Sequence, residues 1–470
     1  MKEAECVNLC RKALRRLVPS KREKEETLSI TKTMVERLDQ EIKRREIENV
    51  KVRIEGSIAK NTWISGDRDI DIFILFPKKF SKKDIVSIGL DIAKILFEKW
   101  KERYAEHPYI QGRINSYRID VVPGFEIRDI SEMQTAVDRT PLHTEYVNKH
   151  LAIRQLDEVR LLKGFMKGIG VYGAEIKTGG FSGYLGELLV IGYDTFIEVL
   201  KSCQKWRKRE VVDIQKHYED PEMTRKIFSD EFIVVDPVDK TRNVAAALTP
   251  AKLDEFRAAA YAFLKDPTLK FFFPEKRKPH TSEEIKSTIR ARGTDVLLLV
   301  FEAPDIVPDV LWGQLYKSVK AVKQILSQNE FRVTREGVWS DEEKTVAMIF
   351  ELENANLPKV RTHTGPPVGS PNQDIFLEKY AESDRVLSGP WIEGGRWVIE
   401  LKRDYADAKE CLAEELRTNI DSVGLGKYIR KKIEEGYEIY RNEDITNVCK
   451  KNYEFSDFIT RFFRKTPTWF

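Results

Sequence analysis

The 470-residue sequence is poor in cysteine and has no long apolar run. Its five cysteines form an odd set without a CxxC pair, which argues against a disulfide framework and a zinc site and favours reduced thiols. The first residues, MKEAECVNLCRKALRR, lack the apolar core of a signal peptide, and no stretch reaches the length of a membrane span. We therefore expect a soluble, cytoplasmic protein with no membrane contact.

The sequence also lacks an excess of either charge. Lys and Arg number 80 against 76 Asp and Glu, a net charge of +4, so any nucleic-acid surface must be a local patch. A hydrophobic fraction of 41% is enough to bury real cores, which excludes a disordered chain. The length predicts about two to four domains.

The first third of the chain predicts a small mixed sheet with helices. Helical periodicity runs to about residue 51, and a capping box at Ser81 opens another helix. Gly56-Ser57 reads as a turn leading into a helical turn. Strands are expected at 52–55, 70–76, 109–114 and 117–122, the last two forming a hairpin around Asn115-Ser116.

The rest of the chain alternates helical and strand patterns. Helices are expected from Asp157 to near Gly168, over 183–200 as one long helix, and after the Thr249-Pro250 cap. The stretch FFFPEKRKPHTSEE reads as a boundary and RTHTGPPVGSPNQD as a loop, followed by a strand and a helix. Between these two stretches, residues 293–352 give a βαββ order, which suits a ferredoxin-like or RNA-binding sheet but also occurs in domains without an RNA partner.

Two aspartates interrupt the apolar strand DIDIFILF. Asp69 and Asp71 lie on the same face because side chains alternate along a strand. Two carboxylates ~4 Å apart repel by about 4 kcal/mol at an effective dielectric of about 20, so a positive group should compensate them. Mg²⁺ is the natural candidate. The alternative is that Asp69 merely begins the strand and Asp71 pairs with a nearby Arg or Lys.

Three further features favour metal-dependent chemistry. The turn at Gly56-Ser57 offers backbone N–H groups and a hydroxyl to a phosphate. Asp120, in YRIDVVP, would supply a third carboxylate if its strand neighbours the first. Donors for a polyphosphate follow the turn closely: Lys60, Asn61 and Thr62. This set predicts two-metal nucleotidyl transfer with Asp120 as general base.

Nine ordered motifs between Val52 and Ala247 carry a family resemblance. They are GSIAKNTW, DIDIFILFP, RYAEHPY, IDVVPGF, AVDRTPLH, EVRLLKGFMK, GVYGAE, GGFSGYL and VVDPVDKTRNVAA. Together they resemble the archaeal class I CCA-adding enzymes, the tRNA nucleotidyltransferases of the DNA polymerase β superfamily. The resemblance implies template-independent addition and repair of the 3′-terminal CCA of tRNA from CTP and ATP, with Mg²⁺ as cofactor and pyrophosphate released.

The resemblance also implies roles for single residues. The metal-binding catalytic carboxylates would be Asp69, Asp71 and Asp120. The contacts to triphosphate and sugar would be Ser57, Lys60, His143, Lys163 and Tyr172. Arg242 would read the base and Glu106 would lie near the nucleotide or the tRNA end. Lys60 stands where the family has Arg, which keeps a phosphate contact as a point charge.

Simpler interpretations exist for four of these residues. His143 could cap a helix, Tyr172 could be core, and Lys163 could be a solvated helix charge. Arg242 could be a charge in a loop. The order of the motifs favours the functional interpretation of all four.

The fold class implied is multidomain α+β. A mixed-sheet nucleotidyltransferase palm would occupy 1–148, a mostly helical domain that contributes to base recognition 149–275, and C-terminal α+β domains that bind the tRNA acceptor stem 276–470. The segments KSCQKWRKREVVDIQKHY, YIRKKIEEGYEIYRN and FITRFFRKTPTWF are basic and aromatic. RNA binding suits all three; the first could equally be one solvated helix face, and the other two a homodimer contact or core. Alternative functions are a poly(A) polymerase of the same superfamily and a catalytically inactive RNA-binding relative.

Overall fold

The computed structural model describes residues 2–104, 107–275, 277–450 and 452–470. The chain divides into two compact units. Unit 1 comprises Met1–Lys276 together with Pro467–Phe470, and unit 2 comprises Arg277–Thr466. The last residues of the sequence therefore belong to the first unit. Within the described residues, none of the helices has the length and apolar character needed to cross a membrane.

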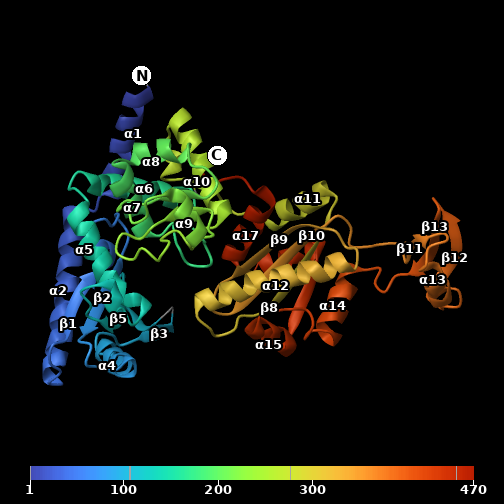
Figure 1. Cartoon of the computed structure of the whole chain (residues 1–470), viewed down its shortest axis with the longest axis horizontal. Coiled ribbons are helices and arrows are strands. Elements are labelled where there is room, and N and C mark those ends of the chain that lie inside the picture. Colours follow the sequence, from blue (N-terminus) through green and yellow to red (C-terminus); the bar gives the residue numbers. More distant parts are fainter. Residues whose placement is uncertain (1, 105–106, 276, 451) are drawn as a thin grey trace. The chain divides into compact units, whose positions relative to one another are not determined.

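Unit 1 contains a mixed sheet with the strand order β1-β2-β5-β4-β3 (Figure 1). Its strands are β1 (Lys51–Glu55), β2 (Asp69–Phe76), β3 (Trp100–Tyr104), β4 (Pro108–Ile114) and β5 (Tyr117–Phe125). Strands β2 and β5 pair in parallel, and the other neighbours are antiparallel. The predicted strands are confirmed except that β3 was missed, because its charged sequence WKERY is typical of an edge strand and lacks an apolar face.

Helices surround this sheet and extend beyond it. They are α1 (Lys2–Leu17), α2 (Lys21–Arg44), α3 (Gly56–Ala59), α4 (Lys82–Lys94) and α5 (Thr140–His150). Helix α2 presents Met34, Leu38 and Ile42 to the buried face of the sheet. The predicted capping box at Ser81 is confirmed, with Asp84 as its second member.

The remainder of unit 1 is mostly helical. Its elements are α6 (Gln155–Gly168), α7 (Gly183–Tyr193), α8 (Phe196–Cys203), β6 (Glu210–Val212), α9 (Pro221–Ile227), β7 (Phe232–Val234) and α10 (Pro250–Lys265). The prediction of one helix over 183–200 was wrong. Asp194 has φ +75° and ends α7, and the Thr195 side chain caps α8. The sequence pattern did not indicate the break between α7 and α8, because apolar residues that are buried continue on both sides of it.

Residues 467–470 complete the core of this helical part. The Thr468 hydroxyl donates to the Gly168 carbonyl oxygen at 2.8 Å. The ring of Trp469 stacks on that of Phe271 with centroids 5.3 Å apart. Phe271 itself packs against Phe165 in the centre of the helical part. Trp469 thus covers Phe271 of unit 1 although the two residues are 198 positions apart in the sequence.

Unit 2 is built on a sheet with the order β14-β8-β10-β9. Its elements are α11 (Ser282–Arg292), β8 (Asp295–Glu302), α12 (Pro308–Gln328), β9 (Val333–Ser340), β10 (Thr345–Leu352), α14 (Ala408–Thr418), α15 (Lys427–Glu435), β14 (Tyr437–Arg441), α16 (Thr446–Cys449) and α17 (Tyr453–Arg464). Leu297 and Leu299 of β8 share a core with α12, α14 and α15, whereas Val296 and Leu298 share one with α11 and α17. Helices therefore cover both faces of the sheet (Figure 1).

A second, smaller sheet lies between β10 and α14 in the sequence. Its order is β11-β13-β12, and its elements are β11 (Val360–Pro367), α13 (Gln373–Tyr380), β12 (Val386–Glu393) and β13 (Arg396–Lys402). The loop predicted for RTHTGPPVGSPNQD was wrong over residues 361–367, which form β11. The prolines suggested a loop, but Pro367 lies at the end of an edge strand, after a register shift, where the missing N–H is tolerated.

Several aromatic residues in the segments considered for RNA binding are core residues, which was one of the alternatives left open for the C-terminal segments. Trp206 is buried against Phe232 and donates its indole N–H to the Tyr193 hydroxyl at 3.1 Å. Phe462 and Phe463 are buried in the second core of unit 2. Their apolar rings, rather than the neighbouring charges, determine where these segments pack.

Candidate active site

Asp71 and Asp120 are direct neighbours across the parallel strands β2 and β5. Residues in register on adjacent strands point to the same face of the sheet. Asp69 lies two residues earlier on that face, in register with Arg118. The fold therefore brings the three predicted carboxylates to one edge of one face.

The carboxylate of Asp71 accepts no hydrogen bond and forms no ion pair with the described residues. Burial raises the pKa of Asp71 to about 7, and the neighbouring charges of Asp120 and Asp69 add to that rise. The turn after β1 packs directly against the Asp71 carboxylate. Gly56 has φ +69°, and a Cβ atom there would lie 2.0 Å from Asp71 Oδ2, so only glycine fits.

Asp69 and Asp120 have partners within the sheet. Gln111 Nε2 donates to Asp120 Oδ1 at 2.9 Å. Arg118 pairs with Asp69 at 3.1 Å, and its Nε lies 3.9 Å from Asp120 Oδ2. Burial raises the pKa of Asp120 despite these donors. The expected pairing with an arginine is thus found at Asp69 and not at Asp71.

The donor set fits a divalent cation. Within the described parts of the chain, no three His, Cys, Asp or Glu side chains lie close enough together to hold a metal ion in the present conformation, and Asp69 is paired with Arg118. Yet three hard oxygen donors share one face. Burial raises the pKa of Asp71 most, the charges of Asp120 and Asp69 add to the rise, and no described residue bonded to Asp71 supplies a positive charge. A divalent cation would supply that charge.

Lys60 and Lys163 meet at a buried carboxylate that the sequence reasoning missed. Glu187, on α7, is 0% exposed. Its Oε2 accepts from Lys60 Nζ at 2.5 Å, and its Oε1 accepts from Lys163 Nζ at 2.8 Å and from the Thr62 hydroxyl at 2.5 Å. Burial would raise the pKa of Glu187, but the two ammonium groups lower it to about 2. Lys163 is 2% exposed and is not a solvated helix charge.

Tyr172 lies beside this lysine cluster. A Cβ atom on Gly183 would be 2.9 Å from the Tyr172 hydroxyl and 3.6 Å from Lys163 Nζ, so the glycine leaves room for both. Burial, together with the charge of Glu187, raises the pKa of Tyr172. The phenol therefore stays protonated and can donate a hydrogen bond.

A second buried carboxylate, Asp236, gathers His143 and Arg242. Its Oδ2 lies 2.9 Å from His143 Nε2 and 2.9 Å from Arg242 Nη1, and Tyr184 donates to its Oδ1 at 3.2 Å. The rings of His143 and Tyr184 stack with centroids 4.1 Å apart. His143 is thus tied to Asp236 rather than capping a helix. Burial lowers its pKa despite this carboxylate.

The sequence carried one signal for both missed residues. Glu187 interrupts the apolar run GYLGELLVIGY and Asp236 ends the apolar strand sequence IVVD, as Asp69 and Asp71 interrupt theirs. An acid at such a position needs a partner once the element is buried. Glu106, the remaining residue implied by the resemblance, lies outside the described residues.

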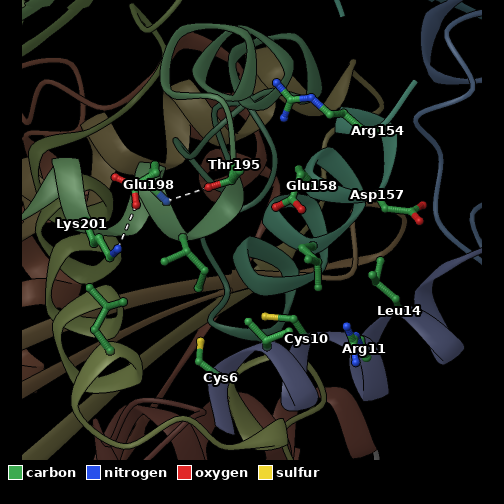
Figure 2. A pocket seen from close by; sticks show the side chains of 14 residues that line it. Cys6, Cys10, Arg11, Leu14, Arg154, Asp157, Glu158, Thr195, Glu198 and Lys201 are labelled. Carbon is green, nitrogen blue, oxygen red and sulfur yellow. Dashed lines mark hydrogen bonds and ion pairs between the residues drawn. The ribbon is translucent and has the colours of Figure 1, made fainter. Parts of the chain in front are cut away.

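Unit 1 also contains a cavity of about 730 Å³ away from these groups. It lies among α1, α6 and α8 (Figure 2), and Cys6, Cys10, Glu158 and Lys201 are among its lining residues. Lys201 pairs with Glu198 at 2.8 Å. None of the predicted site residues lines this cavity.

Family models match three consecutive parts of the chain. Residues 35–143 match the nucleotidyltransferase domain, 157–273 match the second domain of tRNA nucleotidyltransferase, and 292–442 match the C-terminal domain of the CCA-adding enzyme.

Curated relatives match almost from end to end. The CCA-adding enzyme of Methanosarcina barkeri is 38% identical over 96% of this chain and 96% of its own length. That of Methanosarcina mazei is 37% identical with the same coverage of both chains. That of Methanothermobacter thermautotrophicus is 39% identical over 87% of each. By sequence similarity over nearly its whole length, this chain belongs to the CCA-adding enzyme family.

Proposed function

We propose that this protein adds and repairs the 3′-terminal CCA of tRNA, taking nucleotides from CTP and ATP without a template and releasing pyrophosphate. The observation that carries the proposal is the pairing of Asp71 with Asp120 beside the Gly56-Ser57 turn, in a chain that matches CCA-adding enzymes along its length. The reaction is an in-line attack of the tRNA 3′ hydroxyl on the α-phosphorus of the incoming nucleotide.

We further propose Mg²⁺ as the cation held by Asp69, Asp71 and Asp120. When bound, it would polarise the attacking hydroxyl and neutralise charge on the leaving pyrophosphate. Asp120 is suited to accept the hydroxyl proton, because burial raises its pKa and the contact that its Oδ2 makes with Arg118 Nε is long, at 3.9 Å. Asp69 must exchange its contact with Arg118 for the cation.

The nucleotide would lie between the sheet and the helical part of unit 1. Ser57, Lys60, Lys163, Tyr172 and His143 would hold the triphosphate and the sugar. Arg242 would read the base, since its side chain is 33% exposed and one edge of its guanidinium is fixed by Asp236.

We propose three functional domains and an RNA-binding role for unit 2. Residues 1–148 would form the catalytic head, 149–275 the domain that contributes to base recognition, and 276–470 the part that binds the acceptor stem. The protein would act in the cytoplasm, because its cysteines form no disulfide bond among the described residues. Sedimentation of the purified chain tests whether it forms a homodimer.

Extension of a tRNA that lacks its last three nucleotides tests the function. With Mg²⁺, CTP and ATP, we expect addition of C, C and A followed by a stop. Long A tails on arbitrary RNA would favour a poly(A) polymerase instead. Binding of tRNA without any extension would favour an inactive RNA-binding relative.

A further inference from the structure

Glu187 is a fully buried carboxylate that joins two parts of unit 1. Lys60 and Thr62 come from the segment that follows the Gly56-Ser57 turn, whereas Lys163 and Glu187 come from helices α6 and α7. The first pair falls in the region that matches the nucleotidyltransferase domain and the second pair in the region that matches the second domain. A single carboxylate therefore spans the boundary between the two domains.

We propose that Glu187 is a positioning residue for nucleotide binding: it fixes the ammonium groups of Lys60 and Lys163 for a nucleoside triphosphate without touching the nucleotide. This inference rests on the proposed function, which assigns both lysines to the triphosphate.

The two lysines differ in how many of their N–H donors the protein already uses. An ammonium group has three donors. Lys163 Nζ has three acceptors in the protein, Glu187 Oε1 at 2.8 Å and the hydroxyl and carbonyl oxygens of Thr62 at 3.0 and 3.3 Å. Lys60 Nζ has one described acceptor, Glu187 Oε2. Lys60 therefore keeps two N–H donors for phosphate oxygens. Lys163 holds the Glu187 carboxylate in place, and that carboxylate orients the Lys60 ammonium group.

The charges favour the same arrangement. Two ammonium groups this close would repel each other and would be costly to bury without an anion. Glu187 offsets one of the two charges and leaves a net positive charge for the triphosphate. Its carboxylate stays ionised at neutral pH, because Lys163 and Lys60 hold its pKa near about 2.

Glu187→Gln tests the proposal because it keeps the shape of the side chain and removes its charge. We expect the KM for CTP and ATP to rise roughly tenfold or more, with kcat changed less than about threefold, since a charge-assisted hydrogen bond is lost in binding. Competition binding should show that the preference for CTP over CMP shrinks by a similar factor. A merely structural role would weaken both nucleotides equally.

Three further variants complete the design. Glu198→Gln removes an exposed carboxylate that is paired with Lys201, and should leave both readouts unchanged. Glu187→Asp keeps the charge and should keep most of the preference for CTP. If Glu187→Gln does not fold, Thr62→Val removes a hydroxyl bonded to both Glu187 and Lys163 and should raise the KM about threefold.

If Glu187→Gln folds and keeps the wild-type preference for CTP over CMP, the inference is wrong. If that variant does not fold, an unchanged KM in Thr62→Val would contradict the inference instead. Failure of the proposed function is a separate result: the wild-type protein would then bind CTP in preference to CMP without extending tRNA.

Discussion

Asp71 stands directly opposite Asp120 in the parallel pair of β2 and β5, and the Asp71 carboxylate has no donor among the described residues. Replacing Asp71 by Asn keeps its size and removes one of the three proposed cation ligands. We expect nucleotide addition to fall by at least about 100-fold, since a bound metal contributes several kcal/mol to the transition state. Single-turnover extension of truncated tRNA measures this. Asp91→Asn, at an exposed residue paired with Lys94, is the matched control and should keep full activity.

Mg²⁺ should stabilise the wild-type protein. A ligand that binds only the folded state stabilises it by RT ln(1 + L/Kd), where L is the ligand concentration, so the melting temperature rises with the logarithm of that concentration once it exceeds Kd. We expect a dose-dependent rise in Tm for the wild type that chelation reverses, and little rise for Asp120→Asn. An equal rise in both proteins would place the cation elsewhere.

Glu187 predicts a pH dependence of stability. Its pKa in the folded protein is about 2, below the ordinary 4.5, so its contribution is complete above about pH 4.5 and is lost as the pH falls towards 2. At neutral pH this contribution is at most about 3 kcal/mol. Urea unfolding of the wild type and Glu187→Gln should show a gap in midpoint at pH 7 that narrows at pH 3. A gap that widens in acid would contradict the ion-pair assignment.

Asp236→Asn should impair base selection. The amide cannot hold Arg242 and His143 with a full charge, so the guanidinium loses its fixed orientation. We expect the preference for CTP over UTP to fall about tenfold, the size expected for one charge-assisted hydrogen bond. Misincorporation of U into truncated tRNA measures the effect. Full selectivity in a folded variant would remove Arg242 from base reading.

Trp469→Ala should destabilise unit 1 although the residue is nearly 200 positions from its partner, Phe271. Loss of a stacked, half-buried indole costs about 2 kcal/mol. Thermal melting of the variant measures this, with Tyr261→Ala as the control, since Tyr261 is an aromatic residue of unit 1 that is 61% exposed. We expect the control to change stability by less than about 0.5 kcal/mol.

The sequence predicted which face of each strand carries the acids. It could not predict how close acids from different strands lie to each other. Alternation along DIDIFILF was enough to place Asp69 and Asp71 on one face, and YRIDVVP was recognisable as a strand. The register that places Asp71 opposite Asp120 cannot be predicted from either strand's own sequence. A shift by one residue would have turned one carboxylate to the opposite face of the sheet.

The clusters around Glu187 and Asp236 could not be predicted from the sequence, because they form through contacts between distant segments. Glu187 binds Lys60 from 127 positions away and Asp236 binds His143 from 93. The acids themselves were visible inside apolar runs, but their partners were not. Likewise, the break at Asp194 was invisible, because an unusual φ at one residue leaves the hydrophobic pattern intact.

The return of residues 467–470 to unit 1 has a consequence for biosynthesis. Residues 2–275 leave the ribosome long before Trp469 does, so the aromatic face at Phe271 stays uncovered while unit 2 is still being translated. Unit 1 therefore reaches its full stability only after residues 467–470 have been translated. Proteolytic removal of residues 467–470 would loosen the helices that carry Lys163 and Glu187, although the cleavage site is far in sequence from Asp69, Asp71 and Asp120.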